Sequence, residues 1–278
     1  MAMRPQIILL GDSITEQSFG PFGWGAALAD QYKGKYDVVA RGFTGYNTRW
    51  TLFLLGKIFP IRTPNPPSVV TVFLGANDAA IPGGANGWLH VPLPEYRDNL
   101  HQIIAHLKAQ SDSTLIILIT PPPVSEKGLL ACSPHLLDDT SGQPTHVNQF
   151  TGMYAQECVS VAREADVQCL NLWSIFQETP RWEALLSDGI HLSVEGNQVV
   201  FEELVKLLDE SDFVPSTLKI DTLKLDEVPY DSPEEMEDGY ESPDSSFQTW
   251  SAPKVKELLV GHVLVARRWV PSSPGTYS

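Results

Sequence analysis

Five short runs of aliphatic and β-branched residues alternate with helix-length segments along the first three quarters of the chain. We expect strands at Gln6–Leu10, Tyr36–Ala40, Val69–Leu74, Thr114–Thr120 and Val167–Leu170. We expect helices at Gly23–Tyr32, Thr48–Ile58, Pro94–Gln110, Asn148–Ala165 and Val194–Glu210. Strands that are hydrophobic on both faces are typical of a parallel sheet covered by helices on each side. The alternation therefore predicts an α/β protein, built as a three-layer α/β/α sandwich.

The charge of the chain limits its class of partner. The 278 residues are 42% hydrophobic, enough for a substantial core, and carry a net charge of −15 at pH 7. An acidic surface repels the phosphates of nucleic acids and of anionic lipids, so we expect neither as a partner. The apolar runs near the two ends of the chain, of about five and about nine residues, are too short for a secretion signal or a bilayer span. We therefore expect no stable membrane insertion.

The cysteines indicate a reducing compartment. Cys132, Cys158 and Cys169 are an odd number, and no CxxC or Cys/His spacing typical of a zinc site accompanies them. A disulfide framework and a metal site are therefore both disfavoured. We expect a cytoplasmic location.

The composition changes after Glu210. The stretch from Asp226 to Asp244 contains nine acidic residues and no Lys or Arg. Such a segment cannot bury enough apolar surface to offset the entropy lost on ordering. We therefore expect a main domain over residues 1–225 and an acidic, disordered extension over residues 226–278. The extension ends in a short apolar segment, "ELLVGHVLVARRWV". A docking strand, a partner-binding segment and an extension without a role all remain open for this segment.

Polar residues that can carry chemistry follow the ends of the predicted strands. Ser13 follows the first strand, Gly45 the second and Asn77 the third. Asp188 and His191 precede the last helix. Taken singly, each motif is ordinary turn or capping chemistry. The carboxyl ends of parallel strands meet at one edge of a sheet, where open α/β proteins bind ligands. We therefore expect these residues to come together in one site.

The same residue types meet the needs of acyl transfer. Ser13 can act as the nucleophile, His191 as the base that takes its proton, and Asp188 as the carboxylate that orients the imidazole. The backbone N–H groups of Ser13 and Gly45 and the side-chain amide of Asn77 can donate to the developing oxyanion. Each chemical role thus has a candidate.

The chain resembles the GDSL, or SGNH, hydrolase superfamily in four ordered blocks: "GDSIT" at 11–15, "GFTGYNT" at 42–48, "GAND" at 75–78 and "DGIH" at 188–191. The resemblance spans residues 6–208 and implies a flavodoxin-like sheet of five parallel strands in a hydrolase domain over residues 1–225. It assigns Ser13, Asp188 and His191 as the catalytic triad. It also assigns Ser13, Gly45 and Asn77 as the oxyanion hole.

Longer stretches narrow the resemblance to one subfamily. "RGFTGYNTRW", "TVFLGANDA" and "LLSDGIHLS" are similar to the fungal isoamyl acetate-hydrolysing esterases. This similarity implies hydrolysis of acetate esters of medium alcohols, with a role in lipid metabolism and without a cofactor. The acidic extension is not part of the family pattern.

Two alternatives from other classes stay open. A lysophospholipase, a thioesterase or a carbohydrate deacetylase of the same superfamily would use the same residues with a different pocket. A non-catalytic binding protein would carry its function in the acidic extension. An ordinary α/β-hydrolase is disfavoured because the chain has no G-x-S-x-G motif. We expect a small-molecule ester as the substrate, and a homodimer stays open.

The walls of the pocket are harder to assign. The connection "PPPVSEKGLLACSPHLLDDTSGQPTHVNQF" is long enough to fold over the sheet edge and shape the pocket. We interpret its two histidines, His135 and His146, as surface loop residues. Several aromatic residues near the motifs are candidates for an apolar wall, with core packing as the more common fate of such side chains. They are Phe19, Phe22, Trp24, Trp50 and Trp88.

We predict that the acidic extension is dispensable for hydrolysis. Every proposed catalytic residue precedes Leu192, so truncation after Glu227 should leave the hydrolysis of a small acetate ester nearly unchanged. The measurement compares kcat/KM and the melting temperature of the full chain and the truncated chain. A truncated protein that aggregates or loses most activity would show that the extension belongs to the working enzyme.

Overall fold

Five parallel strands form the centre of the fold, in the order β2-β1-β3-β4-β5. They are β1 (Gln6–Gly11), β2 (Asp37–Gly42), β3 (Val69–Phe73), β4 (Leu115–Ile119) and β5 (Gln168–Leu170). The computed structural model describes residues 4–60, 64–132 and 143–211. This strand order is the flavodoxin-like one, in which neighbouring strands β1 and β3 leave their connections on opposite faces of the sheet. The predicted α/β class and the five-stranded parallel sheet are confirmed.

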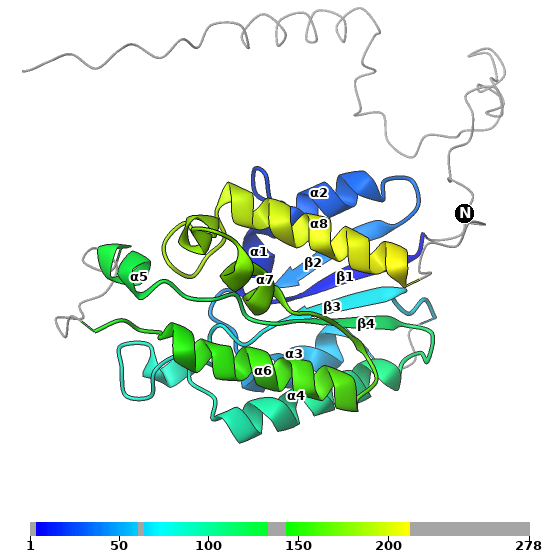
Figure 1. Ribbon diagram of the computed structural model, residues 1–278. Helices are drawn as coiled ribbons and strands as arrows, with labels where there is room; N and C mark the ends of the chain where they lie inside the picture. Colours follow the sequence, from blue (N-terminus) through cyan, green and yellow to red (C-terminus); the bar gives the residue numbers. More distant parts are fainter. Residues whose placement is uncertain (1–3, 61–63, 133–142, 212–278) are drawn as a thin grey trace, which may run out of the picture. The chain divides into compact units, whose positions relative to one another are not determined.

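Helices cover both faces of the sheet (Figure 1). One face carries α1 (Ser13–Glu16), α2 (Trp24–Gln31), α7 (Leu172–Glu178) and α8 (Val194–Glu210). The other face carries α3 (Thr48–Ile58), α4 (Leu93–Lys108) and α6 (Asn148–Glu164). The short helix α5 (Glu126–Cys132) lies beyond the carboxyl ends of the strands. Three turns of 3-10 helix complete the described elements: η1 (Gln17–Phe19), η2 (Gly87–Leu89) and η4 (Trp182–Leu185).

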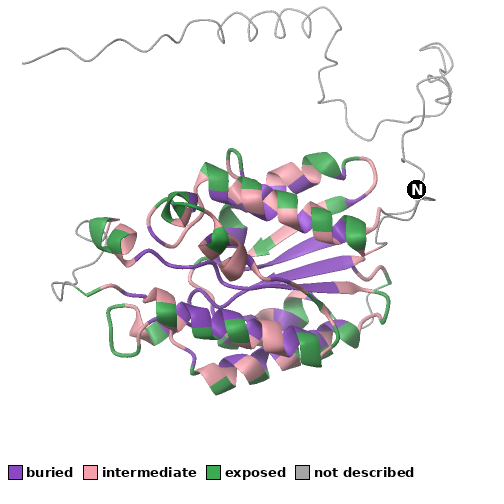
Figure 2. Ribbon diagram, in the orientation of Figure 1, coloured by how far each residue is buried: buried purple, intermediate pink, exposed green. Residues whose placement is uncertain are grey.

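The sheet separates two hydrophobic cores. Alternate side chains of a strand point to opposite faces, so Ile7 and Leu9 of β1 pack with Trp24 on the side of α2 and α8. Ile8 and Leu10 pack with Tyr96 on the side of α4 and α6. Burial follows this layering, with buried residues along the central strands and on the inner faces of the helices (Figure 2). Because both faces are covered, the central strands must be hydrophobic throughout, which explains their continuous apolar runs.

Sequence patterns missed the shortest elements. The helices α1, α5 and α7 have four, seven and seven residues, too few to show a helical period. The strand β2 runs to Gly42 rather than to Ala40, because its last two residues pair with Leu10 and Gly11 of β1.

The predicted domain boundary at residue 225 and the acidic extension lie outside the described residues. In the described part of the chain, no helix has both the length and the hydropathy needed to cross a membrane.

Gly11 is required by close packing at the end of β1, and not by the backbone freedom of a turn. A Cβ there would lie 2.1 Å from Thr15 Oγ1 and 2.6 Å from the Phe73 carbonyl oxygen. We expect Gly11→Ala to lower the free energy of unfolding by about 1–3 kcal/mol, the usual cost of overpacking. Gly56→Ala is the matched control, because a Cβ at this helical position meets nothing within 4 Å.

The control should raise the free energy of unfolding by about 0.5–1 kcal/mol, the difference between alanine and glycine in a helix. Urea denaturation of the two variants beside the parent protein measures both effects. Equal stability of Gly11→Ala and the parent would contradict the packing argument.

Candidate active site

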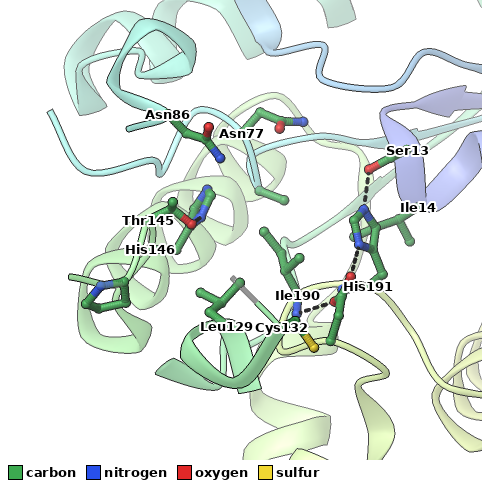
Figure 3. Close-up of a pocket in the computed structure, with 13 residues that line it drawn as sticks. Ser13, Ile14, Asn77, Asn86, Leu129, Cys132, Thr145, His146, Ile190 and His191 are labelled. Atoms are coloured by element: carbon green, nitrogen blue, oxygen red, sulfur yellow. Dashed lines mark hydrogen bonds and ion pairs between the residues drawn. The ribbon is translucent and has the colours of Figure 1, made fainter. Parts of the chain in front are cut away.

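Ser13 lies where β1 ends and helix α1 begins. The side chain of Asp12 caps this helix, with Oδ1 accepting a hydrogen bond of 2.9 Å from the Ile14 backbone N–H. The turn therefore has the capping chemistry that its residues suggest. It also holds Ser13 at the carboxyl edge of the sheet, with its hydroxyl pointing to the ring of His191 (Figure 3).

Asp188 and His191 form a tight turn before α8. Asp188 Oδ1 accepts hydrogen bonds from the backbone N–H groups of Ile190 (3.0 Å) and His191 (2.8 Å). Asp188 Oδ2 lies 2.6 Å from His191 Nδ1, and His191 Nε2 lies 2.9 Å from Ser13 Oγ. The structure thus brings the three predicted triad residues into one continuous chain of hydrogen bonds (Figure 3).

The same contacts set the protonation of this chain. Burial alone would raise the pKa of the Asp188 carboxyl, but hydrogen bonds from His191 and Ile190 outweigh it and hold that pKa well below its ordinary value. The hydrogen bond with Asp188 raises the pKa of His191 above its ordinary value, although burial opposes the shift. Asp188 therefore stays ionised and makes His191 a stronger base.

Asn77 enters the site from the end of β3. Its Nδ2 donates to the Tyr46 carbonyl (2.9 Å) and, over a longer distance, to Asp12 Oδ2 (3.4 Å). Asn77 lines the same cavity as Ser13 and His191. Gly45 precedes Tyr46 in the β2–α3 loop and is not among the residues that line the cavity. The structure therefore joins four of the five predicted site residues at one cavity and places Gly45 in the adjoining loop.

A buried polar network holds the two loops that carry Asn77 and Tyr46. Asp78 accepts hydrogen bonds from the backbone N–H of Thr48 (3.0 Å) and from its hydroxyl. Asn99 donates to the same hydroxyl at 3.0 Å. Burial raises the pKa of Asp78 to about 7, although these hydrogen bonds oppose the shift. The network ties the start of α3 to the residue next to Asn77, and so keeps the amide in place.

A cavity of about 230 Å³ opens beside Ser13. Its residues are Ser13, Ile14, Ala76, Asn77, Asn86, Leu129, Cys132, Pro144, Thr145, His146, Asp188, Ile190 and His191. Five of them, from Leu129 to His146, belong to the long connection between β4 and α6, so the prediction that this connection shapes the pocket is confirmed. Among the residues that the structure describes, no cluster of three His, Cys, Asp or Glu side chains is placed to hold a metal ion.

One expectation about the pocket walls is wrong, and the aromatic candidates for an apolar wall do not line the cavity. His146 is not a surface residue: it is 2% exposed and lines the cavity. His135 lies outside the described residues. None of the five candidate aromatic residues lines the cavity. Trp24 is fully buried in the core, whereas Phe19, Phe22 and Trp88 are exposed. Trp50 is half-buried and contacts Tyr46 edge-on and Trp88 at a tilt. Aliphatic side chains form the apolar walls instead.

An α/β fold with a serine, a histidine and an aspartate in one hydrogen-bonded chain defines the class of serine hydrolases. Comparison with known proteins then identifies the family. Residues 9–199 match the GDSL-like lipase/acylhydrolase family, and the chain belongs to it. It is a carboxylic ester hydrolase, and the resemblance drawn from the four sequence blocks is confirmed.

Relatives with different degrees of sequence identity have names that agree with this assignment. A GDSL esterase/lipase of Arabidopsis thaliana is 46% identical over 248 residues, which cover 88% of this chain and 98% of the relative. The human isoamyl acetate-hydrolyzing esterase 1 homolog is 38% identical over 216 residues, 74% of this chain and 82% of the relative. The crystal structure of a lipase/acylhydrolase from Enterococcus faecalis matches the fold with a TM-score of 0.58 at 21% identity, covering 79% of this chain and all of that one.

Sequence reasoning missed the contribution of Asp12 to the site. This carboxylate is buried, caps the helix of Ser13 and accepts a hydrogen bond from Asn77. Burial raises the pKa of Asp12 to about 7, against the hydrogen bond from Ile14 and the charge of His191. Its negative charge in turn helps to raise the pKa of His191. The only signal in the sequence was its place next to Ser13.

We predict that Asp12→Asn shifts the pH dependence of catalysis. Asparagine caps helices as well as aspartate does, so α1 should keep its start. Loss of the negative charge lowers the pKa of His191, and His191 must be neutral to accept a proton. The acid limb of the pH profile of kcat/KM reports the pKa of the base in the free enzyme. This limb should therefore move to lower pH.

The measurement is a pH profile of kcat/KM for the parent protein and the variant. Asp30→Asn is the control, since it removes an exposed carboxylate outside the site that is not among the groups that shift the pKa of His191. Its acid limb should stay in place. An acid limb that does not move in Asp12→Asn would refute the electrostatic role of Asp12.

Proposed function

We propose that the chain hydrolyses small carboxylic esters in two steps through an acyl-enzyme on Ser13. The observation that carries this proposal is the continuous chain from Ser13 Oγ through the His191 ring to Asp188, with links of 2.9 and 2.6 Å, at one end of a cavity. A nucleophile, a base and an orienting carboxylate in hydrogen-bond contact are the arrangement that activates a serine.

In the first step, Ser13 Oγ attacks the ester carbonyl while His191 Nε2 takes the hydroxyl proton. Asp188 remains ionised and stabilises the imidazolium that forms. The side-chain amide of Asn77 and the backbone N–H groups of Ser13 and Gly45 donate to the oxyanion. The long contact of Asn77 with Asp12, at 3.4 Å, is the weaker of its two hydrogen bonds and is the one that the oxyanion displaces.

His191 then passes its proton to the alcohol oxygen, and the alcohol leaves as the acyl group stays on Ser13. In the second step, His191 takes a proton from water, and the resulting hydroxide attacks the acyl carbonyl. The same donors hold the second oxyanion. Collapse of this intermediate returns the proton to Ser13 and releases the carboxylic acid, so no cofactor takes part.

We further propose acetate esters of medium alcohols as the substrates. Similarity to isoamyl acetate-hydrolyzing esterase homologs supports this choice. The size of the cavity also supports it, because about 230 Å³ lies below the range of pockets that enclose drug-sized ligands. Aliphatic side chains next to Ser13, including Ile14 and Ile190, suit a short hydrocarbon chain. A role in lipid metabolism stays part of the proposal.

A cytoplasmic location is likewise proposed. All three cysteines of the chain fall within the described residues and are free thiols, which is usual where the surroundings are reducing. The substrate is proposed as a freely diffusing small ester, without nucleic acid as a partner.

We predict that Ser13→Ala lowers the hydrolysis of 4-nitrophenyl acetate by at least ~10³-fold, because the acyl-enzyme route is lost. Ser160→Ala is the matched control, since the Ser160 hydroxyl donates to the Gln156 carbonyl within α6 and Ser160 is not among the residues that line the cavity. A fluorophosphonate should label the parent and the control, but not Ser13→Ala. Hydrolysis or labelling that survives in Ser13→Ala would contradict the mechanism. A preference for long-chain nitrophenyl esters over the acetate would contradict the proposed substrate class alone.

A further inference from the structure

Helix α5 lies against the turn that carries Asp188 and His191. A Cβ on Gly128 would lie 2.8 Å from the Gly189 Cα and 3.0 Å from the Gly189 nitrogen. A Cβ on Gly189 would lie 2.4 Å from the Leu129 nitrogen. These contacts join backbone to backbone, so neither side can make room by turning a side chain. The two glycines thus let α5 pack closer to the histidine turn than larger residues would allow.

Hydrogen bonds hold α5 in this place from two sides. The Ser125 N–H donates to the Gly189 carbonyl (2.9 Å), and Ser125 Oγ accepts from the Gly128 N–H (3.2 Å). On the other side, Glu126 Oε1 accepts from the Asn148 N–H at 2.8 Å, at the start of α6. Glycine is a poor residue inside a helix, so the close contact, and not helix formation, explains Gly128.

The residue that follows each of the two glycines lines the cavity. Leu129 follows Gly128, and Ile190 follows Gly189. The contact between the glycines therefore fixes the separation between the α5 wall of the cavity and His191, the proposed base.

Leu129 is the wall residue best placed to meet the hydrocarbon part of an ester. Of the leucine, isoleucine and alanine residues that line the cavity, Ile14, Ala76 and Ile190 are each next in sequence to a proposed site residue. These three therefore adjoin the reacting bond. Leu129 comes from a separate element and lies on the opposite side of the pocket from Asn77 (Figure 3). An ester whose oxyanion forms at Asn77 places its hydrocarbon chain against Leu129.

We propose that Leu129 determines the chain length of the esters that the site accepts, and that Gly128 positions Leu129 and His191 relative to each other. The inference rests on the proposed esterase function. The substrates are esters whose hydrocarbon chain ends at the α5 wall. A chain that is too long pushes against α5 and, through the glycine contact, against the turn of the proposed base.

Two series of esters test Leu129 on the full-length protein. Ethyl, butyl and hexyl acetate vary the alcohol, and the 4-nitrophenyl esters of acetate, butanoate and hexanoate vary the acyl group. The quantity compared is the ratio of kcat/KM for the longest ester to kcat/KM for the shortest. Leu129→Ala should raise this ratio roughly 10-fold in one series, since one methylene in an apolar pocket is worth about 10-fold to 200-fold. Leu129→Phe should lower the same ratio, because it shortens the cavity.

Leu130→Ala is the matched control for both substitutions. Leu130 is the next residue of α5, is 39% exposed and does not line the cavity. The ratios of this variant should equal those of the parent protein in both series. Thermal melting verifies that each variant is folded.

Gly128→Ala tests the positioning role. The added methyl group should displace the Gly189 backbone and lower kcat about 10-fold or more for every ester, with KM changed less than about threefold, because a shift of ~1 Å in a catalytic group costs up to ~10²-fold. Gly56→Ala is the control, since a Cβ there meets nothing within 4 Å. If Gly128→Ala does not fold, Ser125→Ala removes the hydroxyl that accepts from the Gly128 N–H and should lower kcat in the same direction.

Unchanged ratios in both Leu129→Ala and Leu129→Phe would overturn the role of Leu129. The kcat of the parent in folded Gly128→Ala, or in Ser125→Ala where only that variant folds, would overturn the role of Gly128. Either result leaves the esterase function in place. No hydrolysis of any of these esters by the parent protein would overturn the proposed function together with the inference, so the failures are distinguishable.

Discussion

The pairing of β1 with β3 is the constraint on which the rest of the structure depends. Gly11 lies beside Phe73 in the parallel register, so the chain leaves both strands at the same edge of the sheet. Ser13 follows one strand and Asn77 the other, and Asp12 contacts both the Ser13 turn and the Asn77 amide. The lack of a side chain at Gly11 allows this close approach. The proposed nucleophile and the proposed oxyanion donor are therefore neighbours because two hydrophobic strands are neighbours.

The turn of Asp188 and His191 lies between η4 and α8. Packing holds it at this edge as well as hydrogen bonds. Gly189 has a φ of +98°, and a Cβ there would lie 2.4 Å from the Leu129 backbone nitrogen. The Ser125 N–H donates to the Gly189 carbonyl at 2.9 Å. Ser125 and the helix α5 that follows it therefore hold the histidine turn, and α5 also lines the cavity through Leu129 and Cys132. This shared contact links the position of the proposed base to the shape of the pocket.

Charge is distributed unevenly around the site. Asp188 is surrounded by hydrogen-bond donors and stays ionised, whereas Asp12 and Asp78 are fully buried with pKa values raised to about 7. His191 lines the cavity together with Ser13, its hydrogen-bond partner. Across the aliphatic walls, His146 is kept neutral by burial. The cavity thus runs from a charged end at Asp188 and His191 to an uncharged end at His146.

Local patterns in the sequence were enough to predict the layers of the fold. They were also enough to predict that Ser13, Asn77, Asp188 and His191 lie together in one site. Strand hydrophobicity and strand-end position are local properties, and in a parallel sheet they translate directly into a shared edge. The roles of Asp12 and His146 depended on contacts between segments far apart in the chain. The burial of His146 and the absence of the aromatic residues from the cavity follow from how two loops pack over the sheet, which no periodicity records. A strand leaves a signature in its own residues, whereas the wall of a pocket exists only once separate loops have met.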